Sequence, residues 1–187
     1  MTTTFMPNTW PVLMALCLYS DCHGYLESAA HFIDRGGGRH EEAFLNHLKQ
    51  LYVPRGCGLS VTIKNARGKG ALHVIDWTAK QIANADYDAV AALLDTDTDW
   101  NAKTEKLAKS KKIQVLKSEP CLEAMMLRLI GKSANGDAQA LKKRFAPFVN
   151  NDPTQRESYA LHFGPVYLMA GRSKEPTINA LLRLFGR

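Results

Sequence analysis

The chain has 187 residues, of which 45% are hydrophobic and 22% charged, as is ordinary for a globular protein. No apolar run reaches the ~18 residues that a membrane-spanning helix needs, so no membrane span is expected. The net charge of +6 permits a polyanionic partner without requiring one.

The first 30 residues are the hardest to interpret. The apolar run at 10–19, WPVLMALCLY, suits a core strand, a buried helix or the apolar part of a signal peptide. No basic segment precedes it and no clean cleavage site follows, so we expect a cytoplasmic protein. The four cysteines form no C-x-x-C pair, so reduced thiols are expected, with Cys57 and Cys121 packed rather than reactive.

A glycine-rich loop separates the first expected strand from the first expected helix. Residues 31–33 predict a short strand, and Gly36–Gly38 follow it. Residues 41–51 have apolar side chains at the spacing of a core-facing helix. Backbone amides of such a loop can cradle phosphate, although the G-K-[ST] ending of a P-loop is missing. The alternative is a plain turn, with Glu41 and Glu42 favoured by the helix dipole.

The next unit combines a strand with a basic loop. Residues 59–63, LSVTI, alternate and are rich in β-branched side chains, which predicts a strand. Residues 64–70 then bring Lys64, Arg67 and Lys69 together with two glycines. That loop could bind phosphate by charge and backbone amides, or be a solvated connection.

Helices and strands alternate through the middle of the chain. Residues 71–85 predict an amphipathic helix, 89–94 a buried strand, 101–112 a lysine-rich helix and 113–116 a short strand. The expected apolar stripe of the first of these helices is Leu72, Ile75, Ala79 and Ile82. This alternation argues for parallel strands joined by helical crossovers.

Three acids at alternate positions follow the buried strand. If the backbone stays extended, Asp95, Asp97 and Asp99 point to the same side, where their charges repel one another. A divalent cation such as Mg²⁺ would offset that repulsion. The alternative is a solvated turn in which Asp97 or Asp99 caps the next helix.

A further helix is expected after residue 116. Pro120 suits its first position, and Ser118 or Glu119 its cap. Its broad apolar face predicts core, and Glu123 is therefore either buried with a partner or on the opposite, solvated side. Residues 137–148, 158–171 and 177–184 predict further helices, with Lys142, Lys143 and Arg144 as a solvated basic cluster.

Four segments, taken in order, resemble the RloB-like family of the Toprim superfamily, which includes primase, topoisomerase and OLD-type nuclease domains. They are HEEAFLNHL, VTIKNARGKG, YDAVAALLDTDTDW and SEPCLEAMML. The resemblance covers roughly residues 34–185. It implies a Toprim-like α/β core at 31–132, with a mostly parallel sheet flanked by helices. A helical extension at 133–187 would pack on that core, and residues 1–30 stay unassigned.

The resemblance also implies site residues. Asp95 and Asp97 match the D-x-D metal ligands of the superfamily. Glu41 matches the second acid of the family's E-G-x-x-T-E segment, and Glu123 matches the acid of its S-x-P-C-x-E segment.

One acid of the pattern is missing. The first Glu of E-G-x-x-T-E falls on Arg35 or Gly36, and His40 stands where the family has Thr. Asp34 could replace that Glu if the glycine loop is rearranged. Asp21 could do so if residues 10–19 are the first strand.

The expected function is Mg²⁺-dependent phosphodiester chemistry on DNA or RNA, with Mn²⁺ as an alternative ion, in a prokaryotic antiviral defence setting. Glu41, Asp95 and Asp97 would carry the chemistry, Asp34 and Glu123 would add metal ligands, and Lys64, Arg67 and Lys69 would bind substrate. A protein partner encoded nearby is a further expectation, and the oligomeric state stays open. Two alternatives remain. One is an inactive Toprim-like module that binds nucleic acid or protein, and the other is an enzyme acting on small phosphate compounds.

Overall fold

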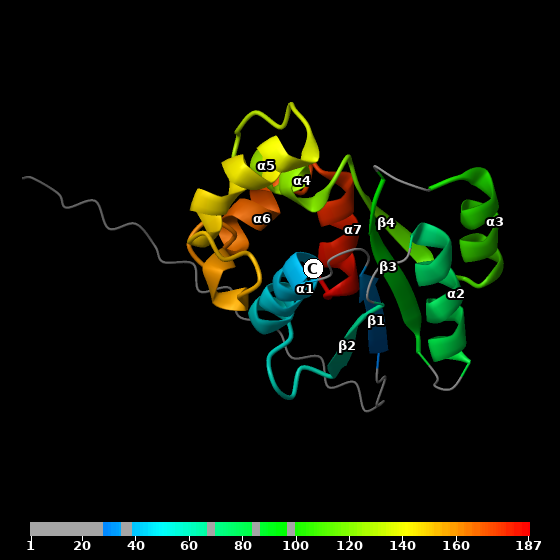
Figure 1. Ribbon diagram of the computed structural model, residues 1–187. Helices are drawn as coiled ribbons and strands as arrows, with labels where there is room; N and C mark the ends of the chain where they lie inside the picture. The colour runs from blue at the N-terminus through cyan, green and yellow to red at the C-terminus, as the bar shows by residue number, and fades with distance from the viewer. Residues whose placement is uncertain (1–27, 35–38, 67–69, 84–86, 97–99) are drawn as a thin grey trace, which may run out of the picture.

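A computed structural model describes residues 28–34, 39–66, 70–83, 87–96 and 100–187, with the backbone alone for the first of these ranges. Within them the chain is a mixed α/β structure. A parallel sheet lies in the middle, and helices cover both of its faces (Figure 1).

The sheet has four described strands in the order β2-β1-β3-β4, and every neighbouring pair is parallel. The strands are β1 (Ser28–Asp34), β2 (Leu59–Asn65), β3 (Ala89–Asp95) and β4 (Gln114–Ser118). They are connected by α1 (Arg39–Tyr52), α2 (Ala71–Ile82) and α3 (Ala102–Ser110). The predicted alternation of strands and helices and the parallel pairing are therefore confirmed, and each strand is longer than its sequence pattern indicated.

β3 is apolar throughout because it is covered on both sides. Ala91 and Leu93 belong to the larger hydrophobic cluster, which α1 and the C-terminal helices cover. Ala92 and Leu94 belong to the smaller one, which α2 and α3 cover. Alternate side chains of a strand point to opposite faces, so a strand buried on both faces needs a continuous apolar run.

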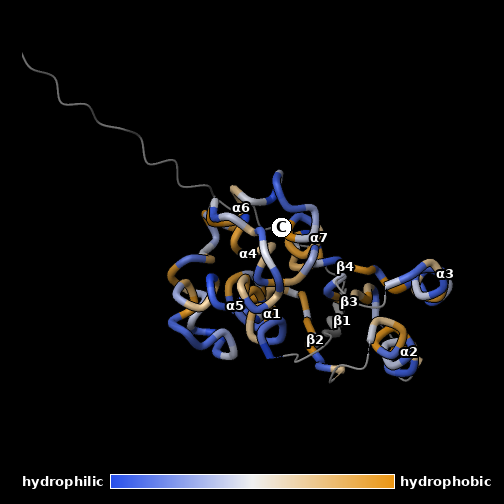
Figure 2. The backbone as a smooth tube through the Cα atoms, turned by 45° about the horizontal axis from the view of Figure 1, so that its top comes forward, coloured by the Kyte–Doolittle hydropathy of each residue, from blue (hydrophilic) through white to orange (hydrophobic). Residues whose placement is uncertain are grey.

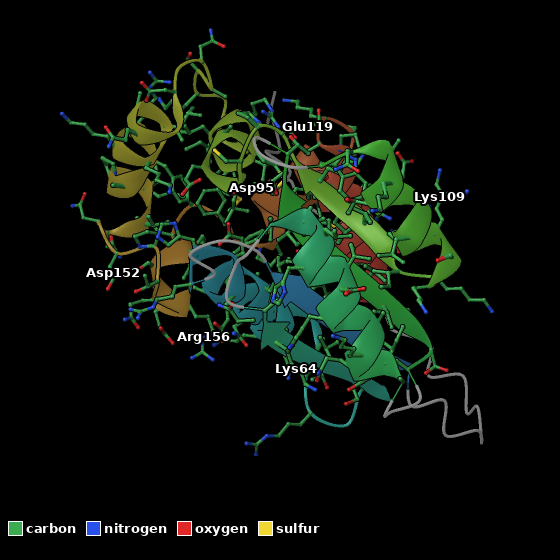
Figure 3. The ribbon with its side chains drawn as sticks, turned by 45° about the vertical axis from the view of Figure 1, so that its right-hand side comes forward. Lys64, Asp95, Lys109, Glu119, Asp152 and Arg156 are labelled. Atoms are coloured by element: carbon green, nitrogen blue, oxygen red, sulfur yellow. The ribbon has the colours of Figure 1, made fainter. Side chains whose placement is uncertain are left out.

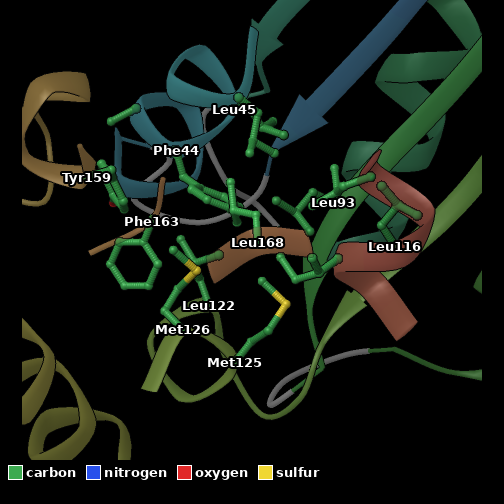
Figure 4. Close-up of a cluster of buried hydrophobic side chains, with 14 of the residues drawn as sticks. Phe44, Leu45, Leu93, Leu116, Leu122, Met125, Met126, Tyr159, Phe163 and Leu168 are labelled. Carbon is green, nitrogen blue, oxygen red and sulfur yellow. The ribbon is translucent and has the colours of Figure 1, made fainter. Parts of the chain in front are cut away.

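The C-terminal residues form α4 (Leu122–Leu129), α5 (Ala138–Phe145), α6 (Pro165–Gly171) and α7 (Pro176–Leu184), with two 3₁₀ turns, Ala146–Val149 and Arg156–Tyr159. Their buried side chains share one cluster with α1, β3 and β4. Figure 4 shows Phe163 and Tyr159 beside Phe44, with Met126 beneath them. The C-terminal helices therefore complete the core on one face of the sheet.

Two predicted helices are interrupted. The expected helix at 158–171 is instead a 3₁₀ turn followed by α6, which starts at Pro165. Proline has no backbone N–H to donate and favours the first helical position, so a new helix begins there. The expected helix at 137–148 tightens into a 3₁₀ turn after Phe145, where Pro147 follows.

The buried face of α2 differs from its predicted stripe. Ala71, Val74, Ile75 and Thr78 are buried, whereas Leu72 is 42% exposed. Successive helical residues are 100° apart, so the face that Ala71 and Ile75 turn to the sheet leaves Leu72 outside. The prediction that Cys57 packs is also wrong, because its thiol lies in an exposed turn.

The cap of α3 is Asn101, whereas Asp97 and Asp99, the predicted caps, lie outside the described residues. The Asn101 side chain accepts hydrogen bonds from the amides of Lys103 at 3.0 Å and Thr104 at 3.1 Å. The lysines of this helix leave it mostly hydrophilic, as Figure 2 shows. None of the helices in the described ranges is long and apolar enough to cross a membrane.

The side chain of Leu93 is fully buried in the larger cluster. Truncating it to alanine should therefore lower the free energy of unfolding by about 2–5 kcal/mol. Urea denaturation of Leu93→Ala beside Leu72→Ala measures this. The Leu72 variant removes the same atoms from a half-solvated position and should cost well under half as much. Equal losses would contradict the two-sided burial of β3.

Candidate functional site at the carboxyl edge of the sheet

Asp95 joins the ends of two elements. It is the last residue of β3, and its Oδ1 accepts a hydrogen bond from the Leu122 backbone amide at 3.0 Å. The next amide, Thr96 N–H, lies 3.2 Å from both the Ser118 and the Pro120 carbonyl oxygens. The segments that follow β3 and β4 are thereby fixed to each other.

The start of α4 differs from the prediction. Ser118 is still in β4, paired with Asp95, and the Glu119–Pro120 peptide bond is cis. The helix begins at Leu122, after Cys121 in the cap position, and the Cys121 side chain provides no capping bond. The Asp95 carboxylate, from a neighbouring strand, accepts from the first amide of the helix, one of the four that have no partner within it.

Glu123 is buried, with 3% of its surface exposed, so the alternative of a solvated position is excluded. Its Oε1 lies 3.0 Å from Nδ1 of His40, at the start of α1. Burial raises the pKa of the Glu123 carboxyl, but hydrogen bonds from His40, its own backbone and Cys121 outweigh burial and hold the pKa below its ordinary value. The carboxylate is therefore charged at neutral pH.

The bond from the Leu122 amide to Asp95 brings this carboxylate to the residue before Glu123, and the thiol of Cys121 is influenced by both acids. Burial, then the charges of Glu123 and Asp95, raise the pKa of this thiol to about 12, despite an opposing backbone hydrogen bond. The thiol is thus protonated at neutral pH and does not act as a nucleophile. This agrees with the expectation that Cys121 packs.

Glu41 faces the same region from the first turn of α1 and is 9% exposed. The buried Tyr159 hydroxyl lies 3.1 Å from the His40 carbonyl oxygen and 2.9 Å from that of Pro153. Burial, and then the negative charges of Glu41 and Glu123, raise the pKa of Tyr159. Asp95, Glu123 and Glu41 therefore come from three different elements to one region at the carboxyl edge. Figure 3 labels Asp95 at the end of β3.

The described part of the chain shows only some of the predicted metal ligands. Asp34 ends β1, the strand next to β3, but its side chain lies outside the described residues, as does Asp97. Among the side chains that are described, no three His, Cys, Asp or Glu residues group closely enough to hold an ion. A complete ligand set would therefore need Asp34 or Asp97.

The predicted phosphate loop is shorter than expected. Lys64 belongs to β2, not to a loop, and its Nζ donates a hydrogen bond to Gln81 Oε1 at 2.9 Å. Arg67 and Lys69 lie outside the described residues.

A groove of about 910 Å³ runs from Thr96, next to Asp95, along β4 to α7. Its cationic lining residues are Lys117, Arg128 and Lys174. Arg128 is bound to Glu175 through two hydrogen bonds, of 2.6 and 2.9 Å. The Lys117 ammonium lies 5.0 Å from the centre of the Trp100 ring. Arg128 is thus engaged by Glu175, whereas Lys117 and Lys174 take no part in that ion pair.

Exposed lysines also follow β3. Lys103, Lys106 and Lys109 lie on α3, and Lys111 and Lys112 follow it, all exposed. Lys109 pairs with Glu105 at 2.9 Å. The predicted basic cluster Lys142, Lys143 and Arg144 is exposed as expected.

Two partners of the acids were not among the residues predicted from the sequence. His40 and Glu123 are 83 positions apart, and no local pattern links them. Asn65, at the end of β2, donates a hydrogen bond to Glu42 Oε2 at 3.1 Å. Asn65 could have been predicted as a site residue, because it is polar and lies at the carboxyl end of a predicted parallel strand.

Comparison of this chain with protein-family models, with curated proteins and with solved structures gave no match.

Replacing Asp95 tests its capping bond. Asp95→Ala leaves the Leu122 amide without this acceptor and should lower the free energy of unfolding by about 1 kcal/mol. Asp95→Asn keeps a side-chain oxygen and should lose less. Urea denaturation at neutral pH measures both, and a larger loss in the Asn variant would contradict the capping role.

The Glu123 carboxyl should make stability depend on acid pH. Its pKa is lower in the folded than in the unfolded protein, so its contribution is present above the unfolded pKa and is lost as the pH falls through the folded value. Glu123→Gln takes up no proton there. Between about pH 5 and pH 3, the free energy of unfolding should therefore fall less steeply in this variant than in the wild type. Parallel slopes would contradict the lowered pKa.

Proposed function

We propose that this protein carries out Mg²⁺-dependent phosphodiester chemistry on nucleic acid, in the manner of the Toprim-like domains of the RloB-like family. The single observation that carries the proposal is the gathering of Asp95, Glu41 and Glu123 at one edge of a parallel sheet. Carboxylates are expensive to collect in a partly buried place unless a cation or a proton offsets their repulsion.

The strand order supports a site at this edge. β1 and β3 are neighbours, but the chain leaves β1 toward β2 and leaves β3 toward β4, in opposite directions. In open α/β sheets the crevice at such a reversal, outside the carboxyl ends of the strands, is where ligands bind. Asp34 and Asp95 end the two strands that border it.

The proposed ligands follow from these positions. Asp95 and Asp97 would hold Mg²⁺, or Mn²⁺, with a third carboxylate from Asp34 or Glu41. Glu123 is the weakest of the candidates, because His40 already pairs with its carboxylate. Bound Mg²⁺ would polarise the phosphoryl oxygen and orient water, while the chain's own lysines offset the charge of the phosphate.

The substrate would be held mainly through its backbone. The exposed lysines lie on and just after α3, which contacts β4. Of the groove cations, Lys117 lies on β4 and Lys174 just before α7, which also contacts β4. Charge of this kind attracts phosphates without reading bases, so affinity should depend strongly on salt and weakly on sequence.

A second candidate is a catalytically inactive module that binds nucleic acid. It is favoured by one observation: Asp95 and Glu123 each already accept a hydrogen bond within the protein. Arg35 or Gly36 at the position of the first Toprim glutamate points the same way. Such a module would bind nucleic acid equally well in EDTA.

The deciding experiment is a nuclease assay on labelled single- and double-stranded DNA and RNA, with Mg²⁺, with Mn²⁺ and with EDTA. We expect cleavage that requires the metal and that Asp95→Asn slows by about a hundredfold or more. Asp137→Asn is the matched control, because Asp137 also accepts a capping amide hydrogen bond, at the start of α5, away from the sheet edge.

Equal cleavage by the wild type and Asp95→Asn would exclude the metal mechanism. If no polymer is cut but filter binding persists in EDTA and weakens steeply with added salt, the inactive module is the correct assignment.

A further inference from the structure

An apolar surface is exposed around α6. Leu161 is 71% exposed, Val166 79%, Tyr167 54% and Met169 45%. These four side chains, called the α6 surface below, are most of the large hydrophobic residues that are exposed in the described part of the chain. Scattered exposed leucines are ordinary, but a contiguous set on one short segment marks a place that another apolar group covers.

The segment that carries the α6 surface is uncharged. Residues 158–171 contain no Asp, Glu, Lys or Arg, in a chain that is 22% charged overall. The residues that anchor α6 are Leu168, whose side chain belongs to the larger cluster, and Gly171, whose backbone lies against Leu129. The exposed residues therefore do not hold the fold together, and their apolar character needs another explanation.

The same chain contains an apolar segment of matching character. Residues 2–20 have no charged side chain, and they include the run Trp10–Tyr19. This segment lies outside the described residues. A ten-residue apolar run and an exposed apolar surface in one molecule each favour removal from water, and contact between them would satisfy both.

The point where the chain enters the sheet makes that contact reachable. Ser28, the first residue of β1, pairs with Leu59. The Leu59 side chain lies beside Gly186, just after α7, and α7 packs against α6. The nine residues of α7 measure about 14 Å at 1.5 Å per residue, whereas eight extended residues, the number between Tyr19 and Ser28, span up to about 28 Å.

We propose that the segment Trp10–Tyr19 packs on the α6 surface of its own chain. An attached segment has an effective concentration in the millimolar range, well above that of a second copy in dilute solution. A dimer formed through two α6 surfaces would also leave the apolar segment in water. The intramolecular contact is therefore favoured on both counts, and it is independent of the proposed chemistry at the sheet edge.

Cys17 reports on this contact, because it lies within the segment. In the full chain carrying Cys22→Ser and Cys57→Ser, the other thiol is Cys121, which is buried and protonated. The experiment measures the rate at which iodoacetamide alkylates Cys17, site by site in a mass spectrometer. The parent chain is compared with Val166→Asp, a change at the most exposed member of the surface.

We expect Val166→Asp to raise the alkylation rate at least tenfold without changing the circular dichroism spectrum. Leu72→Asp is the matched control, since Leu72 is an exposed leucine on α2, and its rate should equal that of the parent. Equal Cys17 rates in the parent and in Val166→Asp would overturn the proposal. Protection that grows with protein concentration, together with a doubled mass in light scattering, would also overturn it in favour of a second copy.

Discussion

The hydrogen bond from the Leu122 amide to the Asp95 carboxylate fixes the geometry on which the candidate site depends. It ties the end of a buried strand to the start of a buried helix across 27 positions of sequence. The first turn of α4 is thereby set against the sheet, and Glu123 is directed toward His40. Without this bond the helix would begin with unsatisfied amides in a partly buried place, which is costly.

The same carboxylate is thus structural and, by our proposal, functional. A carboxylate has about four acceptor positions, so accepting the Leu122 amide is compatible with a second role for Asp95. The positive end of the α4 dipole lies at the same point and favours negative charge there. A charged Asp95 is consequently stabilised before any ion binds, and the edge can hold several acids that repel one another.

The sequence predicted the strands well because β3 and its neighbours follow simple rules. A continuous apolar run means burial on both faces, and alternation with amphipathic helices means parallel pairing.

Prediction from the sequence failed where the outcome depends on tertiary contacts. Ala71 and Leu72 are adjacent and both apolar, so the sequence pattern of α2 does not decide which of them faces the sheet. The start of α4 is set by Asp95, which no local cap rule includes, so Pro120 was assigned a helical position that it does not have.

The site was predictable in part for the same reason. An acid directly after a buried parallel strand lies at the carboxyl edge, and this argument located Asp95. The choice between a buried and an exposed Glu123 could not be made from periodicity, because it depends on His40, in a different helix. Long-range pairs of this kind decide which acids are held charged inside the protein. Glu123 is engaged in this way by an ionisable side chain, whereas the Asp95 oxygen that fixes α4 accepts from a backbone amide. By that criterion Asp95 is a better ligand candidate than Glu123, although a motif treats the two alike.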